Sequence, residues 1–259
     1  MPILSNAPLI EAIFELRWAE IRRTPTEVHF DFPPEEIELL PGQFRSEMKQ
    51  SGFDFYERLN PESPALPHVV THRFRKKAEV WPCYQLGLGI FTANQINQNY
   101  GWSSYKQTII DGIHALGNAH PKGLIDLPTL GVELRYRDGF IFDEGETAPE
   151  FLEKKLSIGF SEKPVALLET TKIQNDIIFN QISFSVRAIE PRGTLTIIGA
   201  QGFINGRPGF ILDTAIRSAD NDKPALTPDG ISTWLEQAHV LQKHAFETLI
   251  NPDLQRSFK

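Results

Sequence analysis

The chain has 259 residues, 41% of them hydrophobic and 23% charged, which excludes a disordered, collagen-like or coiled-coil protein and suits one large domain or two small ones. Acidic residues outnumber basic ones by 33 to 26, giving a net charge of −7. This charge disfavours nucleic acid as the main partner, because phosphate contacts need a basic surface. The lone cysteine, Cys83, excludes an internal disulfide. Without a signal-peptide pattern or a membrane-spanning apolar run, we expect a cytoplasmic protein with no membrane contact.

The first half of the sequence predicts strands and two helices. Apolar and mostly polar residues alternate over 12–18, which is typical of a strand with one buried face. Apolar residues recur at helical spacing over 102–118. The expected elements are a strand over 12–18, a short helix over 42–50, strands over 53–59, 69–75 and 80–92, and a long helix over 102–118.

The second half predicts the same kinds of element. Short separators between its last four strands favour antiparallel hairpins. Thr227 and Pro228 suit the N-cap and the first position of the last helix. The expected elements are a strand over 132–136 that ends in a turn at Asp138–Gly139, a short helix from Ala148, strands over about 165–173, 176–188, 193–203 and 209–217, and a helix over 228–249.

A five-residue pattern occurs twice, 118 residues apart. Residues 14–18 read FELRW and residues 132–136 read VELRY, and each copy opens the same order of elements. We therefore interpret the chain as a duplication of two α+β units, residues 1–125 and 126–259, packed as one globular protein. The predicted fold class is α+β, in which duplicated β-α-β(3-4)-α units form a curved antiparallel sheet with helices on one side.

This order of elements resembles the TATA-box-binding-protein fold, in which a duplicated unit forms one curved sheet with helices on its convex side. The resemblance is topological. DNA binding does not follow from it, because the sequence shows no apolar wedges on a basic saddle. A helix-grip fold uses similar elements and remains an alternative; there, a curved sheet wraps a long C-terminal helix around a ligand cavity.

The segment LSNAPLIEAIFELR, residues 4–17, resembles the start of a sporadically distributed bacterial family with the pattern N-A-P-[LI]-x-E-A-I. Members share a mid-chain strand that ends in Arg-Tyr, here Arg135–Tyr136, and a late Leu-Asp pair, here Leu212–Asp213. The resemblance brings no catalytic residue or cofactor with it. The patchy distribution of the family implies horizontally moved genes, such as those of defence or toxin–antitoxin systems.

The sequence shows no pattern typical of catalysis or of metal binding. The seven histidines and Cys83 lack zinc-site spacing, and the serine-hydrolase and zinc-protease motifs are absent. The glycines between Gly199 and Gly209 indicate a hairpin, because a phosphate loop would need a helix N-terminus after it. We therefore expect no metal and no cofactor, and a binding protein in preference to an enzyme.

The best candidate surface is the polar face of the repeated strands, together with the basic cluster around Phe74. Gly87 and Gly89 should leave this face open on a neighbouring strand. Two structural alternatives stay open, namely that the charges pair across strands as solvated ladders and that the basic cluster protects an edge strand. The candidate partner-binding residues are Glu15, Arg17, Glu133, Arg135, Arg73 and Arg75.

The predicted function is therefore binding of a protein partner, as an accessory of a bacterial defence or toxin–antitoxin system. A basic protein would suit the acidic chain, because complementary charge speeds association. The alternatives are a nucleic-acid-binding saddle and a helix-grip protein that binds a small ligand.

Overall fold

A nine-stranded antiparallel sheet forms the centre of the computed structural model, which describes residues 8–159 and 181–258 apart from positions 25, 63, 98, 99 and 126. The strand order is β4-β5-β6-β7-β1-β8-β11-β10-β9. These strands are β1 (Leu9–Trp18), β4 (Phe55–Arg58), β5 (Val70–Arg75), β6 (Cys83–Gly87), β7 (Ile90–Ile96), β8 (Thr129–Ile141), β9 (Gln181–Ile189), β10 (Arg192–Ile204) and β11 (Arg207–Ser218). The α+β class with a large antiparallel sheet is confirmed.

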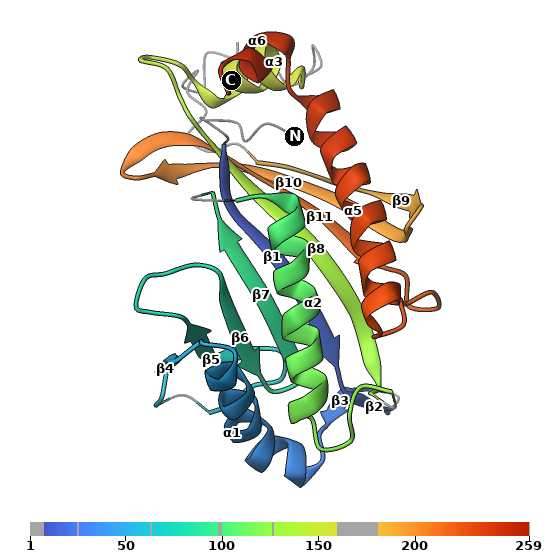
Figure 1. Cartoon of the computed structure of the whole chain (residues 1–259). Helices are drawn as coiled ribbons and strands as arrows, with labels where there is room; N and C mark the ends of the chain where they lie inside the picture. Colours follow the sequence, from blue (N-terminus) through green and yellow to red (C-terminus); the bar gives the residue numbers. More distant parts are fainter. Residues whose placement is uncertain are drawn as a thin grey trace.

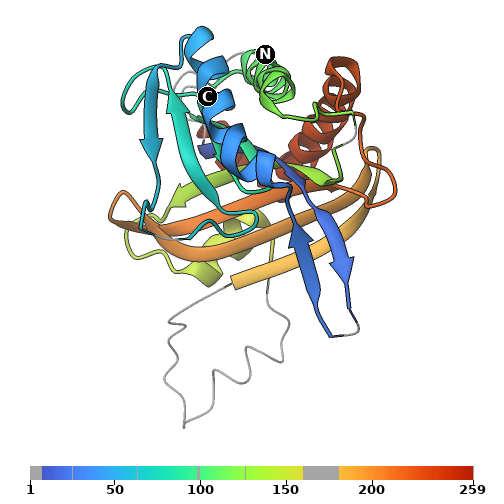
Figure 2. The ribbon, with the colours of Figure 1, turned by 90° about the horizontal axis from the view of Figure 1, so that it is seen from below.

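The long helices lie on one face of the sheet (Figure 1). They are α1 (Pro34–Gln50), α2 (Trp102–Ala119) and α5 (Pro228–Leu249), while the shorter α3 (Ala148–Leu156) and α6 (Pro252–Arg256) lie together at one end. In Figure 2, β5 and β6 (cyan) stand beside α1, whereas β10 and β11 (orange) lie beneath α5 (red). The sheet therefore bends around the helices. None of the described helices combines the length and the apolar character needed to cross a bilayer.

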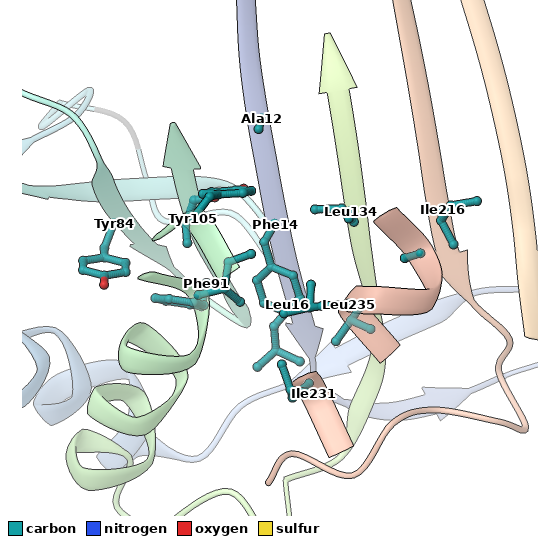
Figure 3. Packing of buried hydrophobic residues seen from close by; sticks show 14 of the residues in the cluster. Ala12, Phe14, Leu16, Tyr84, Phe91, Tyr105, Leu134, Ile216, Ile231 and Leu235 are labelled. Carbon is teal, nitrogen blue, oxygen red and sulfur yellow. The ribbon is translucent and has the colours of Figure 1, made fainter. Parts of the chain in front are cut away.

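The hydrophobic core lies between the sheet and these helices, and it follows from the alternation along β1. Phe14 and Leu16 are fully buried, and they pair in register with Leu134 and Val132 of β8. Figure 3 shows Phe14 and Leu16 pointing toward the helix side, with Leu235 of α5 close to Leu16. The apolar face predicted for residues 12–18 is thus the face that the helices cover.

Three of the predicted helices are confirmed, namely α2, α3 and α5. The Thr227 hydroxyl caps α5 by accepting a hydrogen bond from the amide of Gly230 at 3.2 Å. The prediction for α1 began too late. The helix begins at Pro34, where proline is tolerated because its missing N–H would be unpaired there anyway, and two glutamates favour the first turn.

The single strand expected over 80–92 is wrong, because the chain forms a hairpin of β6 and β7. Gly89 takes a positive φ of 69°, which permits a tight turn after Leu88. Every residue of β6 is buried, so no polar alternation marked where the strand ends. The hairpin of β2 (Glu20–Arg23) and β3 (Val28–Asp31), which stands outside the main sheet, was not predicted.

The turn expected at Asp138–Gly139 is also wrong, because β8 continues through both residues. Asp138 pairs with Leu9 of β1 and with Leu212 of β11, so hydrogen-bonded strands hold it on both sides. The strands expected over 193–203 and 209–217 correspond to β10 and β11, and their antiparallel hairpin is confirmed. The strand expected over 165–173 lies outside the described residues, and β9 covers only the later part of the one expected over 176–188.

The two repeated segments meet as the central strand pair of the sheet. Glu15 of β1 stands directly opposite Glu133 of β8, so Phe14 faces Leu134 and Leu16 faces Val132. On the two sides of this pair the strands follow a matching order, with β7, β6, β5 and β4 beyond β1, and β11, β10 and β9 beyond β8.

Candidate functional site

Four of the predicted charged residues lie at the centre of the sheet face that points away from the helices. Glu15 and Arg17 alternate with buried residues of β1, and Glu133 and Arg135 do so on β8. The Glu15 carboxylate forms an ion pair with Arg17 and lies 2.5 Å from its Nε, and Glu133 and Arg135 form the equivalent ion pair within β8. These four residues form the central charged face, and each charge has an opposite charge beside it.

Arg73 and Arg75 lie on the same side of the sheet, at β5, but the chain's own carboxylates contact both. Glu57 of β4 lies 3.7 Å from Arg73 and 3.8 Å from Arg75. Arg75 also pairs with Glu79 at 3.1 Å, and its guanidinium stacks on Trp81 at 5.0 Å. Only 4% of the Arg75 side chain is exposed, so its guanidinium group is almost completely buried.

The expectation that Gly87 and Gly89 leave the charged side open is wrong. A Cβ atom on Gly87 would lie 2.0 Å from the carbonyl oxygen of Val69, and one on Gly89 would lie 2.5 Å from that of Trp18. Both glycines are therefore sites where two backbones approach closely, and neither leaves space for a ligand.

The clearest hollow lies on the opposite face, between α2, α5 and the sheet. It has a volume of about 280 Å³, and its floor includes Tyr136 and Asp138 of β8 and Thr214 of β11. Helix α6 and the residues after it close one end. Its walls are mostly apolar and rich in aromatic side chains, which are Tyr100, Trp102, Tyr136, Phe246 and Phe258. We call this hollow the interhelix cavity.

A chain of hydrogen bonds crosses one wall of the interhelix cavity. The Tyr100 hydroxyl donates to the Tyr136 hydroxyl at 2.9 Å, and Tyr136 lies 2.9 Å from Nδ1 of His239 on α5. Burial lowers the pKa of His239 to about 4, so the ring is neutral near pH 7 and shares this hydrogen bond with the Tyr136 hydroxyl. The His239 ring also stacks on Trp102, with ring centroids 4.0 Å apart. The position of these aromatic groups is therefore fixed by contacts between β8 and both helices.

Ion pairing holds the two helices together beside the cavity. The Trp102 indole N–H of α2 donates to Glu236 of α5 at 2.9 Å, and Lys106 of α2 forms an ion pair with the same carboxylate. Lys106 holds the pKa of Glu236 below its usual value. This contact fixes the spacing of α2 and α5, and hence the width of the cavity.

Asp138 is the group of greatest chemical interest in the cavity. Its side chain belongs to the helix-covered face of β8, the residue is only 6% exposed, and it lines the hollow. No hydrogen bond joins its carboxyl group to any other described residue. Burial, with a smaller effect from Asp213, raises its pKa to about 7. A carboxyl group in this state can bind as an anion or donate a proton near neutral pH.

Gln242 of α5 adds a second group without a partner. Its amide nitrogen donates to the carbonyl oxygens of Leu134 at 2.9 Å and of Thr214 at 2.7 Å, which anchors α5 to β8 and β11. Its amide oxygen is buried and has no hydrogen-bond partner within the described part of the chain. Within the described residues, therefore, the Asp138 carboxyl and the Gln242 amide oxygen are buried beside the cavity and accept no hydrogen bond.

The interhelix cavity was not predicted from the sequence. A usable signal was present, because Val132, Leu134, Tyr136, Asp138 and Phe140 fall on alternate positions of one strand face. A carboxylate on an otherwise apolar face is unusual and indicates a special role. The pair Asp138–Gly139 instead predicted a turn, so the strand was expected to end before Asp138.

The described ranges contain no group of three or more His, Cys, Asp or Glu side chains that could hold a metal ion. Comparison with known proteins assigns no relative, since no family model, no curated protein and no solved structure matches the chain significantly.

Proposed function

We propose that this protein binds a small ligand in the interhelix cavity. The observation that carries the proposal is Asp138, a carboxyl group that is nine-tenths buried, lines the cavity and has no hydrogen-bond partner among the described residues. Burial of such a group costs free energy unless a partner satisfies it. A bound ligand would supply that partner, which explains why a folded protein retains the group.

The shape of the site supports the same function. Ligand sites are typically concave and mostly apolar, with a few polar groups that orient the ligand. The cavity matches this description, with a volume of about 280 Å³ and mostly apolar walls. Its position beside α5, within the bend of the sheet, agrees with a helix-grip arrangement of sheet and C-terminal helix.

Blocking the cavity should abolish binding without unfolding the protein. Lys243 of α5 lines the cavity and keeps part of its side chain exposed, so Lys243→Trp should fill the entrance. Fragments of a small-molecule library that stabilise the wild type should lose this effect in the variant. A fragment present at a hundred times its Kd should stabilise by about 2.7 kcal/mol, measured as a rise in Tm.

Val240→Trp is the matched control. Val240 lies on the same helix, is 63% exposed and does not line the cavity, so it should leave fragment binding unchanged. Equal responses in both variants, or no fragment that stabilises the wild type, would contradict the proposal.

A second function, binding of a protein partner, is supported by the central charged face. Arg17 and Arg135 are half-buried there, and the exposed Arg217 of β11 stands opposite Glu133. Such a surface of mixed charge suits a partner of complementary charge. We retain this as a separate proposal, together with the role in bacterial defence that the family resemblance implies.

Pull-down from the native host tests the partner proposal. A specific partner should be lost on Arg17→Glu or Arg135→Glu and retained on Lys154→Glu, which reverses an exposed charge on α3. Fluorescence anisotropy with DNA and RNA at about 0.15 M salt tests the nucleic-acid alternative. Submicromolar, salt-sensitive binding of either would favour the saddle over a protein partner.

We also infer that the chain arose by duplication of one unit. The register supports this, because a two-fold axis through the facing Glu15 and Glu133 relates Phe14 to Val132 and Leu16 to Leu134. These are the residues that the repeated pentapeptide aligns. The matching strand order on the two sides of the central pair gives independent support for the duplication. The helices lie inside the bend of the sheet, which differs from the convex placement in the TATA-box-binding-protein fold and favours the helix-grip alternative.

A further inference from the structure

We infer that the ligand of the interhelix cavity is a small amine, bound as an ammonium ion that pairs with the Asp138 carboxylate while its apolar body lies against the aromatic walls. This inference rests on the proposed ligand-binding function and adds the chemical class of the ligand.

The unpartnered buried groups of the cavity favour a ligand that donates hydrogen bonds. The Tyr100 hydroxyl donates to the Tyr136 hydroxyl, which shares a hydrogen bond with Nδ1 of His239, so both tyrosine hydroxyls are engaged. Among the groups that have no hydrogen-bond partner within the described residues are the Asp138 carboxyl and the Gln242 amide oxygen. Both accept hydrogen bonds when Asp138 is ionised, and an ammonium group brings three N–H donors.

The aromatic walls favour a cation in the same place. Tyrosine and tryptophan rings attract cations electrostatically through their faces, and this attraction grows when the cation is desolvated. The cavity combines Tyr100, Trp102 and Tyr136 with a single buried carboxyl group. A carboxylate with surrounding aromatic rings is a suitable environment for an organic ammonium ion, since the rings also shield its apolar body from water.

The other charges around the cavity disfavour an anionic ligand. Of the lysines and arginines in the described part of the chain, Lys243 alone lines the cavity, and it lies 3.7 Å from the carboxylate of Glu247, which also lines it. His239 is held neutral by burial. An anion would therefore face Asp138 without a free positive charge to balance it, whereas an ammonium ion forms a complete ion pair.

Three probes with nearly the same skeleton test the ligand class. We would measure the binding of 2-phenylethylamine, 2-phenylethanol and 3-phenylpropionate to the full chain by calorimetry at pH 8. The amine should bind at least tenfold more tightly than the alcohol, and the carboxylate should bind most weakly. In Asp138→Asn the amine should fall to the affinity of the alcohol, while the affinity for the alcohol should change by less than about threefold.

Glu247→Gln identifies which carboxylate holds the amine. The preference for amine over alcohol should survive this change, and its loss there with retention in Asp138→Asn would overturn the assignment to Asp138. Tightest binding of the alcohol or of the carboxylate would overturn the amine class but would still support a ligand-binding cavity. Failure of all three probes would overturn the amine inference, and the fragment screen with Lys243→Trp would then decide separately whether the cavity binds ligands at all.

Discussion

Replacement of Asp138 with asparagine should make the ligand-free protein more stable at pH 8, by about 2–4 kcal/mol. The reason is that burial raises the pKa of the Asp138 carboxyl from 3.8 to about 7. Each unit of difference between the folded and unfolded pKa corresponds to about 1.4 kcal/mol. Ionisation of Asp138 therefore lowers the free energy of unfolding. Asparagine cannot ionise and has nearly the same shape, so it removes this destabilisation.

The pH dependence follows from the direction of this change. Below pH 4 both the folded and the unfolded chain hold the Asp138 proton, so wild type and variant should differ little. Between about pH 4 and pH 7 the unfolded chain releases the proton first, so the stability that Asp138 contributes falls as the pH rises. Above pH 7 the penalty is complete, and the advantage of the asparagine variant should reach a plateau.

Urea denaturation at several pH values measures this difference directly. Asp143→Asn is the matched control, because Asp143 is an exposed carboxylate that pairs with Lys155 at 2.7 Å. Its loss should cost at most about 1 kcal/mol and should bring no gain at pH 8. A wild type that is as stable as Asp138→Asn at pH 8 would show that Asp138 has a partner or is hydrated in solution.

A gain in stability on replacing Asp138 would also indicate that this residue is kept for function. Residues that weaken the fold are commonly kept because activity requires them, and their replacement trades function for stability. Asp138→Asn should therefore be more stable and yet unable to discriminate amines from alcohols. The two measurements together separate a binding group from a group that only supports the structure.

Sequence periodicity predicted the fold well where each element has one buried and one exposed face. β1 and α5 belong to this class, because β1 alternates strictly and α5 carries an apolar stripe between a threonine cap and a closing proline. β6 and β7 do not, since almost all of their residues are buried and the turn between them carries no polar signal. The missed hairpin is a consequence of burial on both faces.

The two candidate sites also differ in how far they could be predicted from the sequence. The central charged face could be predicted because its residues alternate with apolar ones on two neighbouring strands. The interhelix cavity could not, because Tyr100, Asp138, Thr214 and His239 come from four separate segments that only the tertiary fold brings together. The distances between these residues along the sequence do not predict that they lie close together in the fold. The placement of a carboxyl group on the apolar face of β8 was the one local sign of it.

The other large expected effect concerns Trp234 of α5, because the apolar stripe of this helix predicts that Trp234, Leu235, Leu241 and Leu249 pack beneath the sheet. The structure confirms burial, with 5% of Trp234 exposed and Leu235 fully enclosed. Leu241 and Leu249, expected to be buried with them, are only partly so, because the cavity and the chain end lie beside the second half of the helix. Trp234→Ala should lower the free energy of unfolding by about 3–5 kcal/mol.

This loss should come from packing alone. The Trp234 indole N–H has no hydrogen-bond partner among the described residues, so the substitution removes no hydrogen bond. Urea denaturation followed by far-UV circular dichroism is the suitable measurement, since the chain has four tryptophans and fluorescence would change with the variant itself. Val240→Ala on the exposed side of α5 should change stability by less than about 0.5 kcal/mol. A loss below about 1 kcal/mol for Trp234→Ala would mean that the first half of α5 does not pack on the sheet in solution.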